Sequence, residues 1–127
     1  MKEQIWRLSQ LNIQKLINSR SRVVHAIVIQ SVSKLDFSEI CNIRRTDVDP
    51  DELTIKIRVP GELIVSKIVQ VPREYEKSLL FCYSTSIVLN SNYIFCKRDG
   101  SKMEADYYMR EVKKIFAINR IKMNRIV

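Results

Sequence analysis

Hydrophobic residues recur with helical spacing along the first third of the chain. After Ser9, apolar side chains over 13–17 fall on one helical face before the polar stretch 18–21 interrupts the pattern, which predicts a short helix. Residues 23–29 are almost wholly apolar, and the run extends to Val32. Their β-branched content would suit a strand, but the polar flank and the length of the run favour a buried helix. We therefore expect two consecutive helices.

A third helix is predicted by a capping motif. Residues 36–39 read Asp-Phe-Ser-Glu. In such a capping box the Asp36 side chain accepts a hydrogen bond from the Glu39 amide, while Glu39 reaches back to the Asp36 amide. The helix should run from Asp36 to about Arg45 with its apolar residues inward. The acidic, proline-containing turn 47–51 should stop it.

Alternation of apolar and polar residues next predicts a β-hairpin. Over 53–59 the two kinds alternate strictly, which is the period-two pattern of a strand with one solvated face. The Pro-Gly pair at 60–61 supplies a turn, and 63–71 is a second β-rich run. The polar face of this hairpin should carry Lys56 and Arg58.

The last part of the chain predicts two more helices with irregular segments between them. The spacing of apolar residues indicates a helix over 73–83, followed by short strand-like or irregular pieces at 87–89 and 93–96. Residues 101–104 read Ser-Lys-Met-Glu, a second capping box that should open the final helix. We expect the basic stretch 118–127 to be loosely held.

The composition indicates one folded domain of the α+β class. The chain has 127 residues, 46% apolar and 28% charged, which is typical of a single folded domain with a modest core. We expect a mostly helical domain over 1–127 with a small antiparallel hairpin or sheet. No apolar run approaches the roughly 18 residues that cross a bilayer, and the polar N-terminus does not resemble a secretory signal. A cytoplasmic protein is therefore expected.

The three cysteines do not predict a disulfide or a metal site. Cys41, Cys82 and Cys96 are widely spaced, odd in number and free of any C-x-x-C pair, so buried thiols are the simpler expectation. The sequence also shows no glycine-rich phosphate loop, metal-ligand cluster or Ser/Cys-His-Asp arrangement. We expect no cofactor, no metal and no small-molecule substrate.

Positive charge gathers at both ends of the chain. The net charge is +8; residues 1–45 hold eight Lys/Arg against three acids, residues 46–100 seven against eight, and residues 101–127 seven against three. Such a balance favours a polyanionic partner, with nucleic acid the first choice, although lysine-rich proteomes also produce basic domains without one.

A local signature and the order of the predicted elements resemble a known family. Tyrosine recombinases and phage integrases typically show Gly-Leu-Arg-x-Ser-Glu-apolar, then Leu four residues after the Glu and Asp four further on. Here 34–40 read Lys-Leu-Asp-Phe-Ser-Glu-Ile, with Ile43 and Asp47 at the matching spacings, and Val-Pro at 71–72 is similar to the pair that closes the family's hairpin. The resemblance spans roughly 6–118 and implies the first part of a recombinase catalytic domain.

The chain departs from that family at the catalytic positions. The family cleaves DNA with a tyrosine nucleophile, helped by two arginines, a hairpin lysine and histidines that stabilise the charge on phosphorus. Asp36 stands where the first arginine belongs, so the resemblance implies repulsion of a phosphate there. His25 is the only histidine and lies in an apolar run, while Tyr107 and Tyr108 have core spacing. No DNA cleavage is expected, and the family's His-x-x-Arg and Tyr segment should lie beyond the last helix.

Eight cations are candidates for contact with DNA phosphates. The hairpin cations could touch a phosphate or a minor-groove edge, or be ordinary solvated strand residues. The arginine pair could bind phosphate or complement the negative end of its own helix, and the later cations lie near a predicted helix N-terminus. Lys67, on the returning strand, is the weaker of the hairpin candidates. The set is Arg44, Arg45, Lys56, Arg58, Lys67, Lys97, Arg98 and Lys102.

Three functional hypotheses follow from these patterns. The first is a catalytically inert, recombinase-like protein of viral or mobile-element origin that holds duplex DNA through phosphate contacts. The second is a piece of a split integrase that needs a partner chain, against which Asp36 counts. The third is a protein-interaction module or homodimer, in which Trp6 or the apolar hairpin docks a partner.

Overall fold

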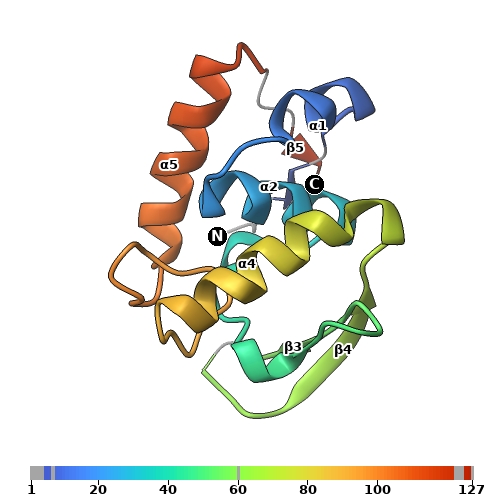
Figure 1. Ribbon diagram of the computed structural model, residues 1–127, viewed down its shortest axis with the longest axis vertical. Helices are drawn as coiled ribbons and strands as arrows, with labels where there is room; N and C mark the ends of the chain where they lie inside the picture. Colours follow the sequence, from blue (N-terminus) through green and yellow to red (C-terminus); the bar gives the residue numbers. More distant parts are fainter. Residues whose placement is uncertain (1–4, 7, 60, 122–124, 127) are drawn as a thin grey trace.

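The fold is organised around α2 (Arg22–Ser33), an apolar helix at its centre. The computed structural model describes residues 5–6, 8–59, 61–121 and 125–126. Every residue of α2 from 23 to 31 is buried, as expected of a helix that is apolar all round. Four helices pack against it, and Figure 1 shows their arrangement. They are α1 (Gln10–Leu16), α3 (Phe37–Cys41), α4 (Glu76–Val88) and α5 (Ala105–Ile118).

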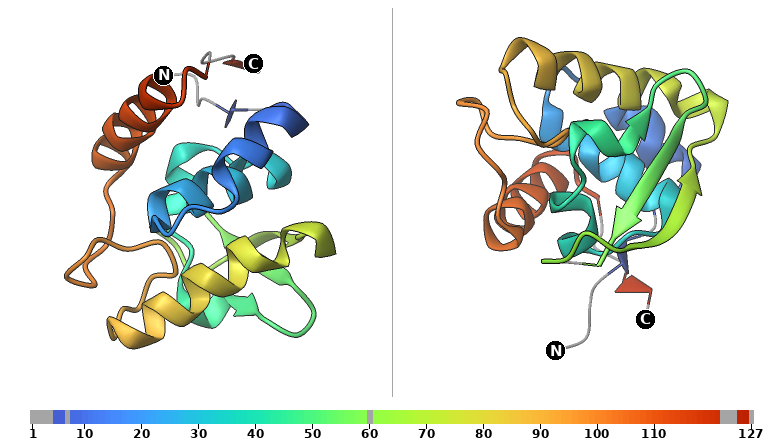
Figure 2. Two further views of the ribbon diagram at one scale, coloured as in Figure 1. Left: turned by 45° about the horizontal axis from the view of Figure 1, so that its top comes forward. Right: turned by 90° about the horizontal axis from the view of Figure 1, so that it is seen from below.

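A small antiparallel sheet lies toward one end of the molecule, as Figures 1 and 2 show. Its strands are β2 (Val48–Asp49), β3 (Thr54–Arg58) and β4 (Val65–Gln70), paired in that order. Two further short strands, β1 (Ile5–Trp6) and β5 (Arg125–Ile126), pair near the chain ends. Single 3-10 turns precede β2 and α4, at η1 (Arg45–Asp47) and η2 (Arg73–Tyr75). This mixture of helix and sheet confirms the predicted α+β class.

Local capping explains where the first three helices begin. Ser9 and Ser21 cap α1 and α2 by accepting from Asn12 N and Val24 N. The predicted capping box at α3 is present, with Asp36 Oδ1 accepting from Glu39 N at 2.7 Å. These caps satisfy amides that have no partner within the helix.

The third helix is shorter than the sequence predicted. It ends at Cys41 instead of running to Arg45, because Asn42 turns its side-chain Nδ2 back to Ser38 O at 2.7 Å. The chain then leaves the helix, and Ile43 O accepts the amide of Ile94. Arg44 and Arg45 are therefore not at a helix C-terminus, and they do not complement a helix dipole.

The fourth helix is longer than predicted, and the fifth begins later. α4 continues to Val88, so the apolar residues 87–88 are helical and not strand-like. α5 begins at Ala105 with no side-chain cap, so the predicted box at Ser101 and Glu104 does not form. Ser101 Oγ instead donates to Asp99 Oδ1 at 2.6 Å, a local turn that competes with helix capping.

The strand register places Lys67 on the opposite face of the hairpin from Lys56 and Arg58. Directly opposite residues share a face in an antiparallel pair, and Lys67 is paired with the buried Ile57. Lys56 is instead paired with Ile68 on the solvated side. The three hairpin cations therefore do not form one polar face.

The chain end is partly held by the fold. We expected 118–127 to be loose, yet Ile121 is buried and Arg125–Ile126 pairs with Ile5–Trp6. Residues 122–124 and 127, and the side chain of Trp6, lie outside what the structure describes. Among the described residues, none of the helices combines the length and apolar character that a membrane crossing requires.

Candidate nucleic-acid interface

Three of the eight predicted cations meet around one cleft of about 230 Å³. Arg44 comes from the segment after α3, Arg58 from the end of β3, and Lys102 from the loop before α5. Asn42, Tyr93 and the hairpin turn complete the lining, and Glu62 is the one carboxylate among the described lining residues. Segments that are distant in sequence therefore place their positive charges at one point.

Arg58 is held in the cleft by a buried carboxylate. Its Nε and Nη2 atoms both donate to Asp47 Oδ1 at 2.8 Å, and Nη1 donates to Leu63 O. The Asp47 side chain is fully buried, and its Oδ2 accepts the backbone amide of Arg44 at 3.1 Å. The Asp47 carboxylate thus holds the side chain of Arg58 and the backbone of Arg44. Much of the Arg58 charge is neutralised by this pairing.

Lys102 is oriented by neutral groups and not by a carboxylate. Its Nζ donates to Asn42 Oδ1 at 2.8 Å and lies 5.6 Å from the centre of the Tyr93 ring. A neutral amide and an aromatic face leave a lysine able to bind an anion as well. Within the described part of the chain, Lys102 has no ion pair.

Arg44 also lines a second cleft, of about 250 Å³, together with Arg45, Thr46 and Asn92. Arg44 is exposed, and Arg45 is half-buried with Nη1 at 3.4 Å from Ser86 O. Neither arginine forms an ion pair with a described residue. Lys102, Arg44 and Arg45 therefore form a row of three cations along two adjoining clefts. We call them the basic row.

The remaining predicted cations lie elsewhere. Lys56 lines a cleft with Asp47 and Asp49, two carboxylates. Lys67 pairs with Glu39 at 3.2 Å on the other face of the hairpin. Lys97 lies 4.7 Å from the centre of the Tyr107 ring, and Arg98 is exposed in the same loop.

Sequence reasoning missed the residues that orient the basic row. Asn42, Tyr93 and the anchoring role of Asp47 have no signal in charge or periodicity. Asp47 did stand at a motif position, so its burial among the cations could have been suspected.

No protein-family model matches this chain, and no curated protein matches its sequence. Among solved structures, the fold is similar to that of the XerA recombinase, with a TM-score of 0.76 and 20% sequence identity. The match covers 94% of this chain and 46% of that chain. The fold is that of part of a recombinase. The chain spans less than half the length of the recombinase that it matches, and the resemblance predicted from the sequence is confirmed for the fold.

Position 36 of this recombinase-like fold is occupied by a buried structural carboxylate. Asp36 is 4% exposed and caps α3 through the bonds with Glu39. Glu39 in turn faces Lys67. Two carboxylates and one lysine therefore lie where the resemblance implies an arginine. Such a group would not attract a phosphate as an arginine does.

Of the candidate nucleophiles and bases, Tyr108 and His25 are buried in the core, as the sequence predicted, whereas Tyr107 is half-buried at its edge. Tyr108 is buried and donates to Gln30 Oε1 at 2.7 Å; burial raises its pKa well above the ordinary value. All three cysteines are buried and free, and burial raises the pKa of Cys41 to about 12. Within the described residues, no group of three or more acidic, histidine or cysteine side chains is placed to hold a metal ion.

His25 is held as a neutral imidazole between two oxygen atoms. Nε2 lies 2.6 Å from Ser19 O, a carbonyl that can only accept, so Nε2 carries the proton and Nδ1 accepts from Ser78 Oγ at 2.9 Å. Burial lowers the pKa of His25, and the bond to Ser19 opposes that shift.

The free energy of unfolding should therefore fall as the pH drops below about 6.5, the usual pKa of histidine in the unfolded chain. There the unfolded chain binds a proton that the folded chain does not, which costs at most about 1.4 kcal/mol per pH unit until the folded pKa is reached. Urea unfolding from pH 7.5 to 5 measures the slope. His25→Asn should flatten it; an unchanged slope would assign the pH dependence to other groups.

Proposed function

We propose that this chain is a catalytically inert, recombinase-like protein that binds duplex DNA through phosphate contacts. The observation that carries the proposal is the basic row, Lys102, Arg44 and Arg45, along two adjoining clefts. Cations without carboxylate partners contribute the most binding free energy toward an anionic ligand, because no existing ion pair has to break. The net charge of +8 supports the same kind of partner.

Phosphate contacts of this kind position a protein on DNA without reading the sequence. Of the two described amide side chains that line these clefts, Asn42 is already bound to Lys102, which leaves the single amide of Asn92 for contact with bases. We therefore propose binding with little sequence preference, dominated by the release of counterions and strongly dependent on salt.

The test is a titration of a fluorescently labelled duplex at several salt concentrations. Arg44→Gln should weaken binding to all sequences alike and reduce the slope of log K against log salt by about 1. Lys113→Gln removes the same charge from the exposed side of α5 and is the matched control, with little expected change. Absence of binding at micromolar protein in low salt, or binding insensitive to salt, would contradict the proposal.

The inert character is tested separately with a nicked suicide substrate that traps covalent protein–DNA adducts. Asp36 and Glu39 lie where the resemblance implies an arginine that would bind phosphate. Of the described tyrosines, Tyr75 and Tyr108 are buried, and Tyr83, Tyr93 and Tyr107 are half-buried. We expect no adduct on denaturing gels. A covalent product that depends on a tyrosine of this chain would overturn this part of the proposal.

A further inference from the structure

Helix α4 carries large apolar residues on both of its long sides, although only one side is covered. Ser78, Leu79, Cys82 and Ser86 are buried on the side that packs against α2. On the outer side, Ile87 is 53% exposed and Val88 is 82% exposed. A helix that is apolar all round is normally buried all round. The outer side of α4 therefore lacks a partner within the described chain.

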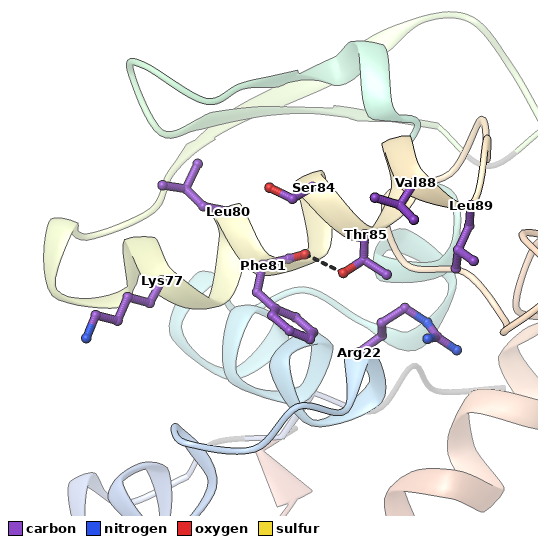
Figure 3. Close-up of a pocket in the computed structure, with 8 residues that line it drawn as sticks. All are labelled: Arg22, Lys77, Leu80, Phe81, Ser84, Thr85, Val88 and Leu89. Carbon is purple, nitrogen blue, oxygen red and sulfur yellow. Dashed lines mark hydrogen bonds between the residues drawn. The ribbon is translucent and has the colours of Figure 1, made fainter.

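This outer side borders an open groove of about 560 Å³, shown in Figure 3. Its lining has large apolar residues toward both ends, with two small hydroxyl residues between them. The hydroxyl of Thr85 donates to Phe81 O at 2.7 Å, so it is satisfied within its own helix and leaves the methyl group for contact. The lining residues of α4 and its C-cap are Leu80, Phe81, Ser84, Thr85, Val88 and Leu89.

The length and shape of the groove suit a helix. The lining runs from Lys77 to Val88 with spacings of three and four residues, a stripe about 16 Å long, or three helical turns. Small residues at Ser84 and Thr85 allow a second helix to approach closely between the larger side chains, as in ridges-into-grooves packing.

Positive charge borders the groove at both ends. Figure 3 shows Lys77 and Arg22 toward opposite ends of the lining. Arg22 Nε donates to Cys96 O at 2.9 Å, which fixes the guanidinium in place. Neither cation forms an ion pair with a described residue.

We propose that this groove docks an amphipathic helix of another protein. Its apolar stripe would cover the outer side of α4, and carboxylates about three turns apart would pair with Lys77 and Arg22. A second copy of this chain is a poorer occupant, because two α4 helices packed antiparallel would bring Lys77 of one copy toward Arg22 of the other. Each copy also carries a net charge of +8.

The test uses a phage-displayed library of 18-residue helical peptides, selected against the full chain. Enriched peptides should show apolar residues at i, i+3, i+4 and i+7 flanked by glutamate or aspartate. The best peptide, fluorescently labelled, should bind Val88→Glu at least about ten-fold more weakly than the parent chain in anisotropy titrations. Val88 is largely exposed, so the variant should fold, which circular dichroism checks.

The controls distinguish peptide binding in the groove from nonspecific hydrophobic binding and from purely electrostatic attraction. Ile118→Glu places the same charge at a 79% exposed apolar position on α5 and should leave peptide affinity unchanged. Lys77→Glu should weaken binding of the acidic peptide. It should strengthen binding of a peptide variant that carries lysine at the end facing position 77. Enriched peptides that are basic, or that bind Val88→Glu as well as the parent, would overturn the proposal. Self-association abolished by Val88→Glu would assign the groove to a second copy instead. None of these readouts involves DNA.

Discussion

Gly100→Ala should lower the free energy of unfolding by about 2–4 kcal/mol. Gly100 has φ +85°, a left-handed conformation that costs an alanine about 1 kcal/mol. A Cβ atom at this position would lie 2.6 Å from the carbonyl oxygen of Leu89, which is backbone and cannot rotate away. The loop 97–102 and the end of α4 would have to separate. Urea unfolding followed by circular dichroism measures the loss.

Gly61→Ala is the matched control for this substitution. Gly61 also has a left-handed φ, +79°, but nothing lies within 4 Å of its Cβ position. Gly61→Ala should lower the free energy of unfolding by only about 1 kcal/mol, from backbone strain alone. Equal losses for the two variants would show that the contact with Leu89 contributes nothing. Because the same loop carries Lys102, Gly100→Ala should also weaken DNA binding.

Asp47→Ala should lower the free energy of unfolding by about 2–3 kcal/mol. The fully buried carboxylate accepts two hydrogen bonds from Arg58 and one from the Arg44 amide. Its removal leaves a guanidinium, 25% exposed, without a charged partner. An unpaired guanidinium that was completely buried would cost more, but water at the exposed part of Arg58 reduces the cost of leaving its charge unpaired.

Glu76→Ala provides the comparison with an exposed ion pair. Glu76 pairs with Arg73 at 3.3 Å on the surface, where the two side chains are 40% and 72% exposed. Glu76→Ala should lower the free energy of unfolding by less than about 0.5 kcal/mol. A loss for Asp47→Ala no larger than that for Glu76→Ala, measured in the same urea series, would refute the anchoring role of Asp47.

Local signals in the sequence predicted the first half of the fold well. Ser9 and the capping box at Asp36 each depend on hydrogen bonds spanning three residues, which a short stretch of sequence determines. The alternation over 53–59 correctly placed Leu53, Ile55 and Ile57 in the core, because strand periodicity is also local.

Signals that depend on distant partners were less informative. Residues 101–104 have the pattern of a helix cap. In the structure, however, Ser101 donates to Asp99, and the backbone of Lys102 forms an isolated β-bridge with Cys96. Lys67 was misplaced because its face depends on the pairing register, which includes an irregularity between Ile57 and Arg58. A shift of one residue exchanges the two faces of a strand.

The sequence predicted which cations are candidates for the site but not where they lie relative to one another. Arg44 and Lys102 are 58 positions apart, and only tertiary structure places both at one cleft. The sequence could not distinguish them from Lys56 and Lys67, which face carboxylates. Counting cations therefore suggests a class of partner. Which cations could bind it depends on the pairing of each cation in the folded chain.

The capping box limits which residues position 36 can hold. The carboxylate supports a helix of only five residues, so Asp36→Arg would remove the cap, at a cost of about 1 kcal/mol, and force a larger cation into a 4% exposed position. Replacing this aspartate by arginine is therefore destabilising as a single substitution. An arginine at position 36 would require a second substitution that caps α3 in another way.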